Sequence, residues 1–119
     1  MKVLIAIKSE LLTDLLSSAL SQHEIHICRT GTDALSQIAS LHPDILLLEL
    51  MLPGTDGITL LRKAEYKPPI ILALTNLVSN YVLTEAAAAG IQDLLLIPCA
   101  LRCILNHLDA LIEKVPSAD

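Results

Sequence analysis

The sequence predicts an α/β domain with a doubly wound, five-stranded parallel sheet. Five short aliphatic segments alternate strictly with five segments of helical spacing, and the connections between them are short. The aliphatic run at residues 45–48 has no polar face, so its strand should be covered by helices on both sides. Its crossovers should be right-handed. The common strand order of such a five-stranded sheet is 2-1-3-4-5, and ligands bind at the carboxyl ends of its strands.

Two strand and helix pairs open the chain. Residues 2–7 form a short apolar strand, and residues 24–29 form a second one with Ile25 and Ile27 on one face. A turn at Gly31 begins the second helix. The apolar positions of the two helices recur at helical spacing, namely Leu11, Leu12, Leu15, Leu16, Ala19 and Leu20 in the first and Ala34, Leu35, Ile38 and Leu41 in the second.

The third strand ends in a charged residue. The run at residues 45–48 is followed by Glu49 and then by a loop rich in proline and glycine. Thr55 or Asp56 can cap the helix that follows this loop. Because ligands bind at the carboxyl ends of parallel strands, we expect the functional site just past Glu49. The inward stripe of the third helix is Ile58, Leu61 and Ala64.

The fourth pair begins after two consecutive prolines. Residues 70–74 form an apolar strand. Ser79 or Asn80 can cap the next helix, which runs through Ala89. Gly90 suits the left-handed position that commonly follows a helix.

The fifth pair completes the alternation. Residues 93–97 form a strand, Pro98 breaks it, and residues 100–114 form an amphipathic helix. We expect residues 1–115 to be one domain and residues 116–119 to be a tail or the start of a linker. The apolar face of the last helix carries Leu101, Ile104, Leu105, Leu108, Leu111 and Ile112.

Composition excludes several classes of protein. Hydrophobic residues make up 53% of the 119 residues, yet no apolar run approaches the roughly 18 to 20 residues that span a bilayer. The first residues lack the length and cleavage site of a signal peptide, so we expect a cytoplasmic protein. Three cysteines are an odd number without an export signal, which argues against a disulfide framework. A net charge of −5 argues against nucleic-acid binding by this segment.

Three motifs give the chain a family resemblance. They are PDILLLELMLPGTDG at residues 43–57, ILALT at residues 71–75 and AAGIQDLLLIP at residues 88–98. Each falls at its expected place in the alternation. Over residues 2–113 the chain resembles the receiver domain of two-component response regulators, which has a flavodoxin-like (βα)5 fold. The resemblance also implies a cis peptide bond between Ile97 and Pro98.

The catalytic residues of that family carry over poorly. In the family an acidic pair at the end of strand one helps to bind Mg²⁺, an aspartate on strand three accepts the phosphoryl group, a lysine on strand five contacts it, and an aromatic residue on strand five switches position. The matching positions here are, in that order, Ile7 and Lys8, Glu49, Ile97 and Leu94. Only the hydroxyl at Thr75 and the loop residues Pro53, Gly54 and Gly57 agree with the family pattern.

These replacements predict that the metal site is lost. Phosphoryl transfer to a carboxylate needs a cation that bridges protein and phosphate, and Mg²⁺ prefers oxygen ligands that include protein carboxylates. Ile7 offers no oxygen ligand, and Lys8 would place a positive charge near the metal position. We therefore expect no Mg²⁺, no other cofactor and no enzymatic activity. One hypothesis is that Lys8 forms an ion pair with Glu49 in place of the metal; the alternative is that Lys8 points into solvent.

Three functions remain open. The resemblance favours an atypical or pseudo-receiver domain, a signalling and interaction module that works without phosphorylation and controls a transcriptional output. The first alternative is a conventional receiver that a histidine kinase phosphorylates, on Glu49 or a nearby residue. The second is a flavodoxin-like binder of small molecules, against which the segment after the first strand lacks a phosphate cradle rich in glycine, serine and threonine.

A silent pocket would move the function to a surface. In the family, the face made by helix four, strand five and helix five commonly forms dimers or contacts output domains. Its candidate residues here are Val82, Ala86, Leu94 and Arg102. We expect protein partners on this face, a possible homodimer or a fused DNA-binding domain, and neither membrane nor direct nucleic-acid contact.

Overall fold

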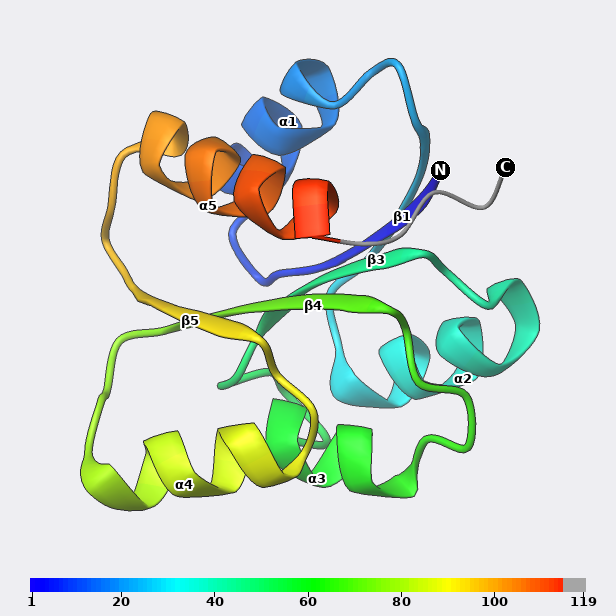
Figure 1. Ribbon diagram of the computed structural model, residues 1–119. Helices are drawn as coiled ribbons and strands as arrows, with labels where there is room; N and C mark the ends of the chain where they lie inside the picture. Colours follow the sequence, from blue (N-terminus) through cyan, green and yellow to red (C-terminus); the bar gives the residue numbers. More distant parts are fainter. Residues whose placement is uncertain (115–119) are drawn as a thin grey trace.

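The computed structural model describes residues 1–114, in which five strands and five helices alternate as predicted (Figure 1). The predicted tail at residues 116–119 lies outside the described residues. The elements in chain order are β1 (Lys2–Ala6), α1 (Glu10–Ala19), β2 (Glu24–Cys28), α2 (Gly31–Leu41), β3 (Ile45–Glu49), α3 (Gly57–Lys63), β4 (Ile70–Thr75), α4 (Asn80–Ala88), β5 (Asp93–Leu96) and α5 (Leu101–Lys114).

The sheet is parallel and has the predicted strand order, β2-β1-β3-β4-β5. Strand β3 lies at its centre, where Leu46 pairs with Leu4 of β1 and with Ile71 of β4. Every residue of β3 is buried, including Glu49. The unbroken aliphatic run therefore reflects a strand that is covered on both faces.

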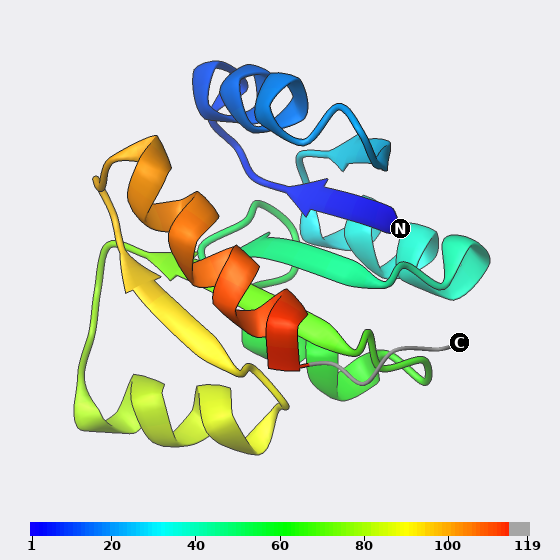
Figure 2. The same ribbon diagram turned by 45° about the horizontal axis from the view of Figure 1, so that its top comes forward.

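Helices cover the two faces of the sheet unequally. Helices α1 and α5 lie on one face, whereas α2, α3 and α4 lie on the other (Figures 1 and 2). Successive side chains of a strand point to opposite faces, so the core is divided into two clusters. Leu4, Leu46 and Leu48 face the three-helix side together with Ile38 of α2. The cluster on the other side is Val3, Ile5, Ile7, Leu16, Leu20, Ile45, Leu47, Ile70, Leu72, Leu74, Leu95, Ile104, Leu108 and Leu111.

Side-chain caps begin four of the helices. In each, a hydroxyl or carboxylate accepts a hydrogen bond from the backbone N–H three residues later. The third helix is capped by Asp56 rather than Thr55, and the fourth by Ser79 rather than Asn80. Gly90 follows α4 with φ of 95°, as predicted. The four caps are Ser9, Thr30, Asp56 and Ser79.

Element ends differ from the sequence prediction by one residue in several places. Strands β1, β2 and β5 each end one residue earlier than predicted, and β4 extends to Thr75. Helix α4 ends one residue earlier, and α5 begins at Leu101. Ile7 and Ile97 consequently lie just beyond their strands, where the chain leaves the sheet.

Some predicted apolar positions are exposed. Leu11 and Leu15 of α1 are 71% and 43% exposed, whereas Leu16 is fully buried. Ile27 is 39% exposed because β2 is an edge strand with a neighbour on one side only. In α3 the predicted stripe missed Leu60, which is fully buried. Hydrophobic spacing thus located these elements but overestimated the width of the buried faces.

The loop after β3 is held against the start of α2. The Gly31 N–H donates a hydrogen bond to the Pro53 carbonyl at 2.9 Å. A Cβ atom at Gly31 would lie 1.8 Å from the Thr55 carbonyl oxygen, a distance at which atoms overlap. Only glycine allows this approach, because it has no side chain. Gly31 therefore determines the position of the loop that follows Glu49.

All three cysteines are free thiols. Burial raises the pKa of Cys28 to about 12. The pKa of Cys99 is also raised, first by burial and then by the neighbouring Cys103. Among the helices that the structure describes, none combines the length and the apolar character that crossing a bilayer requires.

Candidate functional site

The predicted site residues gather at the carboxyl ends of the strands. Glu49 ends β3 beside Leu74 of β4, and Thr75 ends β4 beside Leu96 of β5. Ile7 and Lys8 follow β1, whose last residue, Ala6, pairs with Leu48. Ile97 follows β5. These positions form the edge of the sheet on the left in Figure 1.

The Glu49 carboxylate contacts both the backbone N–H and the side-chain ammonium of Lys8. Its Oε1 accepts a hydrogen bond from the Lys8 backbone N–H at 2.9 Å, and its Oε2 lies 3.6 Å from the Lys8 Nζ. Glu49 is only 8% exposed, whereas the Lys8 side chain is 51% exposed. The predicted ion pair is therefore present, and both carboxylate oxygens are engaged by the same residue.

The residues after β1 do not fit a divalent cation. Ile7 is 1% exposed and packs with the core beneath α1 and α5, so it offers no ligand. Lys8 brings an ammonium to the neighbourhood of the Glu49 carboxylate. Within residues 1–114 no group of three His, Cys, Asp or Glu side chains is arranged to hold a metal ion. Mg²⁺ prefers several oxygen ligands, and this edge of the sheet does not offer them in that arrangement.

The Thr75 hydroxyl is engaged by its own loop. It donates to the Leu77 carbonyl at 3.1 Å and accepts from the Leu77 N–H at 3.2 Å. Thr75 is 2% exposed. Its role in this conformation is to stabilise the turn after β4, as serine and threonine hydroxyls do in many loops.

Ile97 packs rather than binds. Its N–H donates to the Thr75 carbonyl at 2.8 Å, which extends the pairing of β4 and β5 by one bond. The side chain lies partly buried against the cluster beneath α1 and α5. The peptide bond to Pro98 is cis, as the resemblance implied. An aliphatic side chain at this position supplies no positive charge for a phosphoryl oxygen.

Two cavities lie beside these residues. One, of about 270 Å³, lies between the β3–α3 loop and the start of α4 and includes Met51, Thr75 and Val82 in its lining. The other, of about 390 Å³, lies between the start of α1 and the β5–α5 loop and includes Leu12 and Ile97. Apolar side chains dominate both linings, so neither cavity resembles a cradle for phosphate.

Asp56 is the one acidic residue in the linings of these two cavities. Partial burial raises its pKa, but hydrogen bonds from the Thr59 N–H and hydroxyl oppose that effect, and the net pKa is lowered. The two bonds measure 3.0 and 2.8 Å. The carboxylate is therefore committed to capping α3 and is charged near neutral pH.

The predicted interaction face is only partly exposed. Arg102 is exposed, and Val82 and Leu94 are half-buried against the core. Ala86 is 3% exposed and packs onto the sheet, which corrects its assignment to the surface. The small residues that α4 does expose are Ala87 and Ala88.

Two contacts had no signal in the sequence. The bond from the Lys8 N–H to Glu49 depends on a side-chain rotamer, which spacing does not encode. The second joins Asp93 of β5 to His107 of α5, where Oδ2 and Nδ1 lie 2.6 Å apart. The carboxylate and imidazole are fourteen residues apart, and only the packing of α5 on the sheet brings them together.

The strand order and the strand-end residues define a doubly wound α/β domain of the flavodoxin-like class. A two-component response regulator from Clostridium difficile has a similar structure, with a TM-score of 0.88 and 23% sequence identity over 98% of this chain and 99% of that one. The model of the response regulator receiver domain matches residues 3–109. The chain belongs to this family and is a receiver domain of two-component response regulators.

Two curated relatives are longer than this chain. The protein-glutamate methylesterase/protein-glutamine glutaminase 5 of Myxococcus xanthus (strain DK1622) is 32% identical over an alignment of 99 positions that covers 81% of this chain and 28% of the relative. The transcriptional regulatory protein TrcR of Mycobacterium tuberculosis (strain ATCC 25618 / H37Rv) is 26% identical over an alignment of 119 positions that covers 95% of this chain and 46% of TrcR. The chain thus spans less than half the length of each.

Proposed function

We propose that this receiver domain is a degenerate one, a signalling and interaction module that works without accepting a phosphoryl group at the usual position. The observation that carries the proposal is the double contact between Lys8 and Glu49. One oxygen of the carboxylate is bonded to the main chain, and the other faces an ammonium. A nucleophilic carboxylate attacks phosphorus through one oxygen, so at least one of these two contacts would have to break first.

The electrostatics of phosphoryl transfer support the same proposal. An anionic carboxylate and an anionic phosphodonor repel each other unless a cation bridges them. The residues after β1 do not fit that cation, and Ile97 supplies no fixed positive charge. Lys8 compensates the charge of Glu49, and this contact favours one state of the folded domain. It does not replace a bridging metal ion, which would attract the anionic phosphodonor.

A fixed state is the expected consequence. Thr75 is bonded to Leu77, and Leu94 has a branched aliphatic side chain that packs against the core. We infer that the face made by α4, β5 and α5 is presented constantly to a protein partner, with Val82, Leu94 and Arg102 as its contacts. The partner is a second copy of the chain or an output domain.

We propose a transcriptional output carried by another part of a longer protein. The name of TrcR describes a transcriptional regulator, and this chain spans 46% of its length. The net charge of −5 makes the receiver segment itself a poor ligand for DNA. Binding to DNA therefore falls to a separate domain, in which a helix-turn-helix would fit the proposal.

The decisive experiment is a phosphodonor assay with intact-protein mass spectrometry. The protein is incubated with Mg²⁺ and acetyl phosphate, and we expect no gain of a phosphoryl group. The triple variant Lys8→Asp, Glu49→Asp and Ile97→Lys places two carboxylates at the metal position and a fixed positive charge after β5, and it serves as the positive control, with a measurable gain. A stoichiometric gain on Glu49 of the natural chain would overturn the proposal and support a conventional receiver.

A further inference from the structure

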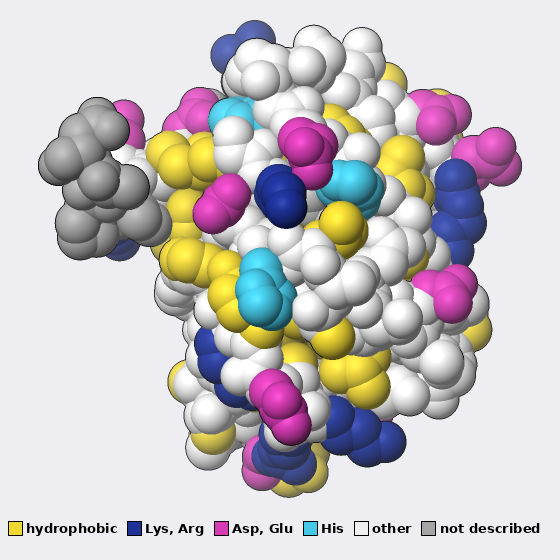
Figure 3. Space-filling view, turned by 90° about the vertical axis from the view of Figure 1, so that its right-hand side faces the viewer, with side chains coloured by type: hydrophobic (Ala, Val, Ile, Leu, Met, Phe, Trp, Pro, Cys, Tyr) yellow, Lys and Arg dark blue, Asp and Glu magenta, His cyan; other side chains and the backbone are white. Residues whose placement is uncertain are grey.

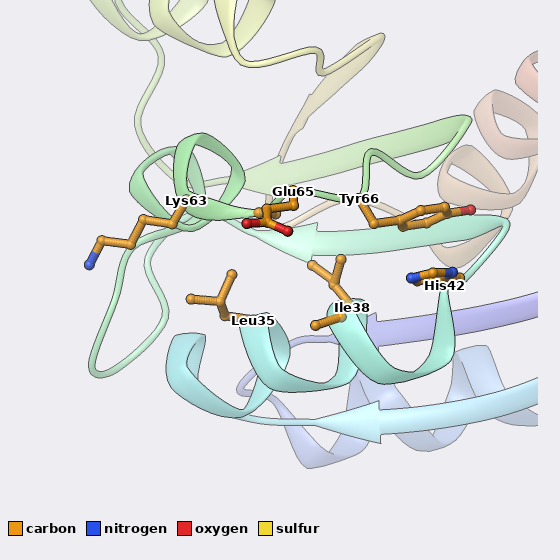
Figure 4. A pocket seen from close by; sticks show the side chains of 8 residues that line it. Leu35, Ile38, His42, Lys63, Glu65 and Tyr66 are labelled. Atoms are coloured by element: carbon orange, nitrogen blue, oxygen red, sulfur yellow. The ribbon is translucent and has the colours of Figure 1, made fainter.

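A third cavity lies between α2 and α3, away from the strand end that carries Glu49. Helix α2 has 11 residues and α3 has 7. At about 1.5 Å per residue, α2 extends about 6 Å farther than α3. Ala64 ends α3 in an extended conformation, and residues 64–66 then line the cavity opposite the last turns of α2. The space between α2 and the segment at residues 63–66 is a cavity of about 290 Å³ (Figure 4).

One end of the cavity is closed by two stacked rings. The rings of His42 and Tyr66 lie 4.3 Å apart and nearly parallel, with 9° between their planes. The Tyr66 hydroxyl donates to the Pro43 carbonyl at 3.0 Å. His42 has left-handed backbone angles, and its N–H donates to the Ile38 carbonyl at 3.2 Å. Both rings are therefore held in place before any ligand arrives, which reduces the entropy cost of binding.

The floor of the cavity is apolar, and an acidic group faces it. Leu35, Ile38 and Ala64 provide the apolar surface. Figure 4 shows the Glu65 carboxylate lying above Leu35 and Ile38, whereas the Lys63 ammonium points away from them. Glu65 forms no ion pair with another described residue. A ligand with a positive group could place that group against the Glu65 carboxylate and its apolar group against the floor of the cavity.

The cavity lies near the amino ends of β3 and β4, because α2 and α3 end there. Figure 3 shows this face of the molecule, on which acidic, basic and histidine side chains are interspersed. No large region of one sign would attract a polyanion or a membrane surface. The volume lies just below the roughly 300 to 1,000 Å³ of typical ligand pockets, which suits a ligand on the order of ten non-hydrogen atoms.

We propose that this cavity binds a small organic ammonium compound, with its positive group at Glu65 and its apolar group on Leu35, Ile38 and Ala64. The stacked His42 and Tyr66 rings limit the length of the apolar group. This site is separate from the strand ends, so its occupancy does not depend on the absence of phosphorylation at Glu49. It would give the receiver domain an input by a small molecule.

The test is a titration of the isotopically labelled full chain followed by amide chemical shifts. The probe is phenethylamine, and its neutral and anionic counterparts are phenethyl alcohol and phenylacetate. We expect saturable shifts at Ile38, Ala64, Glu65 and Tyr66 with the amine, and weaker binding of the alcohol. Absence of saturation at roughly 10 mM amine overturns the proposal. Equal binding of the alcohol or preferred binding of the acid also overturns the assignment of Glu65.

Two variants separate the charge from the shape of the site. Glu65→Gln removes the negative charge, and we expect amine affinity to fall about fivefold to tenfold. Ala39→Leu adds volume at an exposed position of α2 that lines the cavity, and we expect it to abolish binding by filling the space. Glu113→Gln removes an exposed carboxylate on α5 and is the matched control. Unchanged affinity in Glu65→Gln, or an equal loss in Glu113→Gln, would contradict the proposed contact.

Discussion

Glu49 is one methylene group longer than the aspartate that the receiver family has at this position, and the added length changes the contacts of the carboxylate. The longer side chain places one oxygen on the Lys8 N–H and the other near the Lys8 ammonium. Since the Lys8 side chain is half exposed, the ionic contact contributes less than about 1 kcal/mol. A hydrogen bond to a charged oxygen contributes more, about 1.5 to 3 kcal/mol. The main-chain contact therefore orients Glu49, and the ammonium mainly compensates its charge.

The lowered pKa of Asp56 makes the stability of the folded domain depend on pH. Because its folded pKa is lowered, the unfolded chain binds a proton more readily, and the charged cap stabilises the folded state above the unfolded pKa. That stability is lost as pH falls below about 4. We expect Asp56→Ala to lower the free energy of unfolding by about 1 kcal/mol near neutral pH. The difference from the natural chain should shrink toward pH 3 in urea unfolding experiments.

The control for this prediction is Asp56→Asn. Its amide oxygen can still accept from the Thr59 N–H, so most of the capping energy remains, but the group does not titrate. As the pH is lowered, the free energy of unfolding of this variant should therefore fall less than that of the natural chain. An Asp56→Ala difference that stayed constant from neutral pH to pH 3 would show that the carboxylate charge plays no part.

The sequence was sufficient to predict which residues lie at the site, but not which side-chain contacts they make. The strand pattern placed Glu49, Thr75 and Ile97 at the same edge of the sheet, and their chemistry followed from their types. The sequence left two conformations of Lys8 open, and the structure selects the one that reaches Glu49. It gave no sign that the Thr75 hydroxyl bonds to Leu77, because hydroxyl orientation depends on a local turn.

At the scale of elements, the contact between α2 and the β3–α3 loop sets the exit of the central strand. Gly31 donates to Pro53 from the first turn of α2. The absence of a side chain lets the loop carbonyl of Thr55 approach the helix. This close approach joins two segments that the sequence separates by more than twenty residues. The loop that follows Glu49 therefore depends on a glycine in a different helix.

We predict that Gly31→Ala destabilises the protein by about 2 to 3 kcal/mol, the upper range for overpacking. The added methyl group would overlap the backbone of Thr55, which cannot move away as a flexible side chain could. Urea unfolding followed by circular dichroism measures the change. Ser36→Ala, at an exposed position of the same helix, is the control and should change stability by less than about 0.5 kcal/mol. Equal stability of both variants would contradict the close approach.

Element types were predictable because apolar spacing reflects burial, whereas element ends and exposed faces were not. Leu11 and Leu15 satisfy helical spacing as well as Leu16 does, but α5 covers only part of α1. Ile27 matches an inward position, yet an edge strand has one neighbour. Both errors arise from tertiary packing, which a window of local sequence does not contain.

At the scale of the whole molecule, topology followed from alternation. Strict alternation, short loops and right-handed crossovers leave few arrangements, and the order β2-β1-β3-β4-β5 is the common one for five strands. The cavity between α2 and α3 was not predictable. It arises from the different lengths of two helices, and the sequence did not indicate that α3 would end at Lys63.

Ligand binding at the strand ends is coupled to the global stability of the domain. Any ligand that binds only the folded state raises stability, by about 1.4 kcal/mol when it is present at ten times its dissociation constant. Since Ile7 and Lys8 do not fit a cation, we expect Mg²⁺ with beryllofluoride, a phosphoryl analogue, to leave the melting temperature of the natural chain unchanged. The Lys8→Asp with Glu49→Asp variant should show a clear increase under the same conditions, because two carboxylates then face the metal position. Calorimetry of both proteins at matched ionic strength decides the matter: an equal increase in the natural chain would mean that the strand ends of this receiver domain still bind the cation.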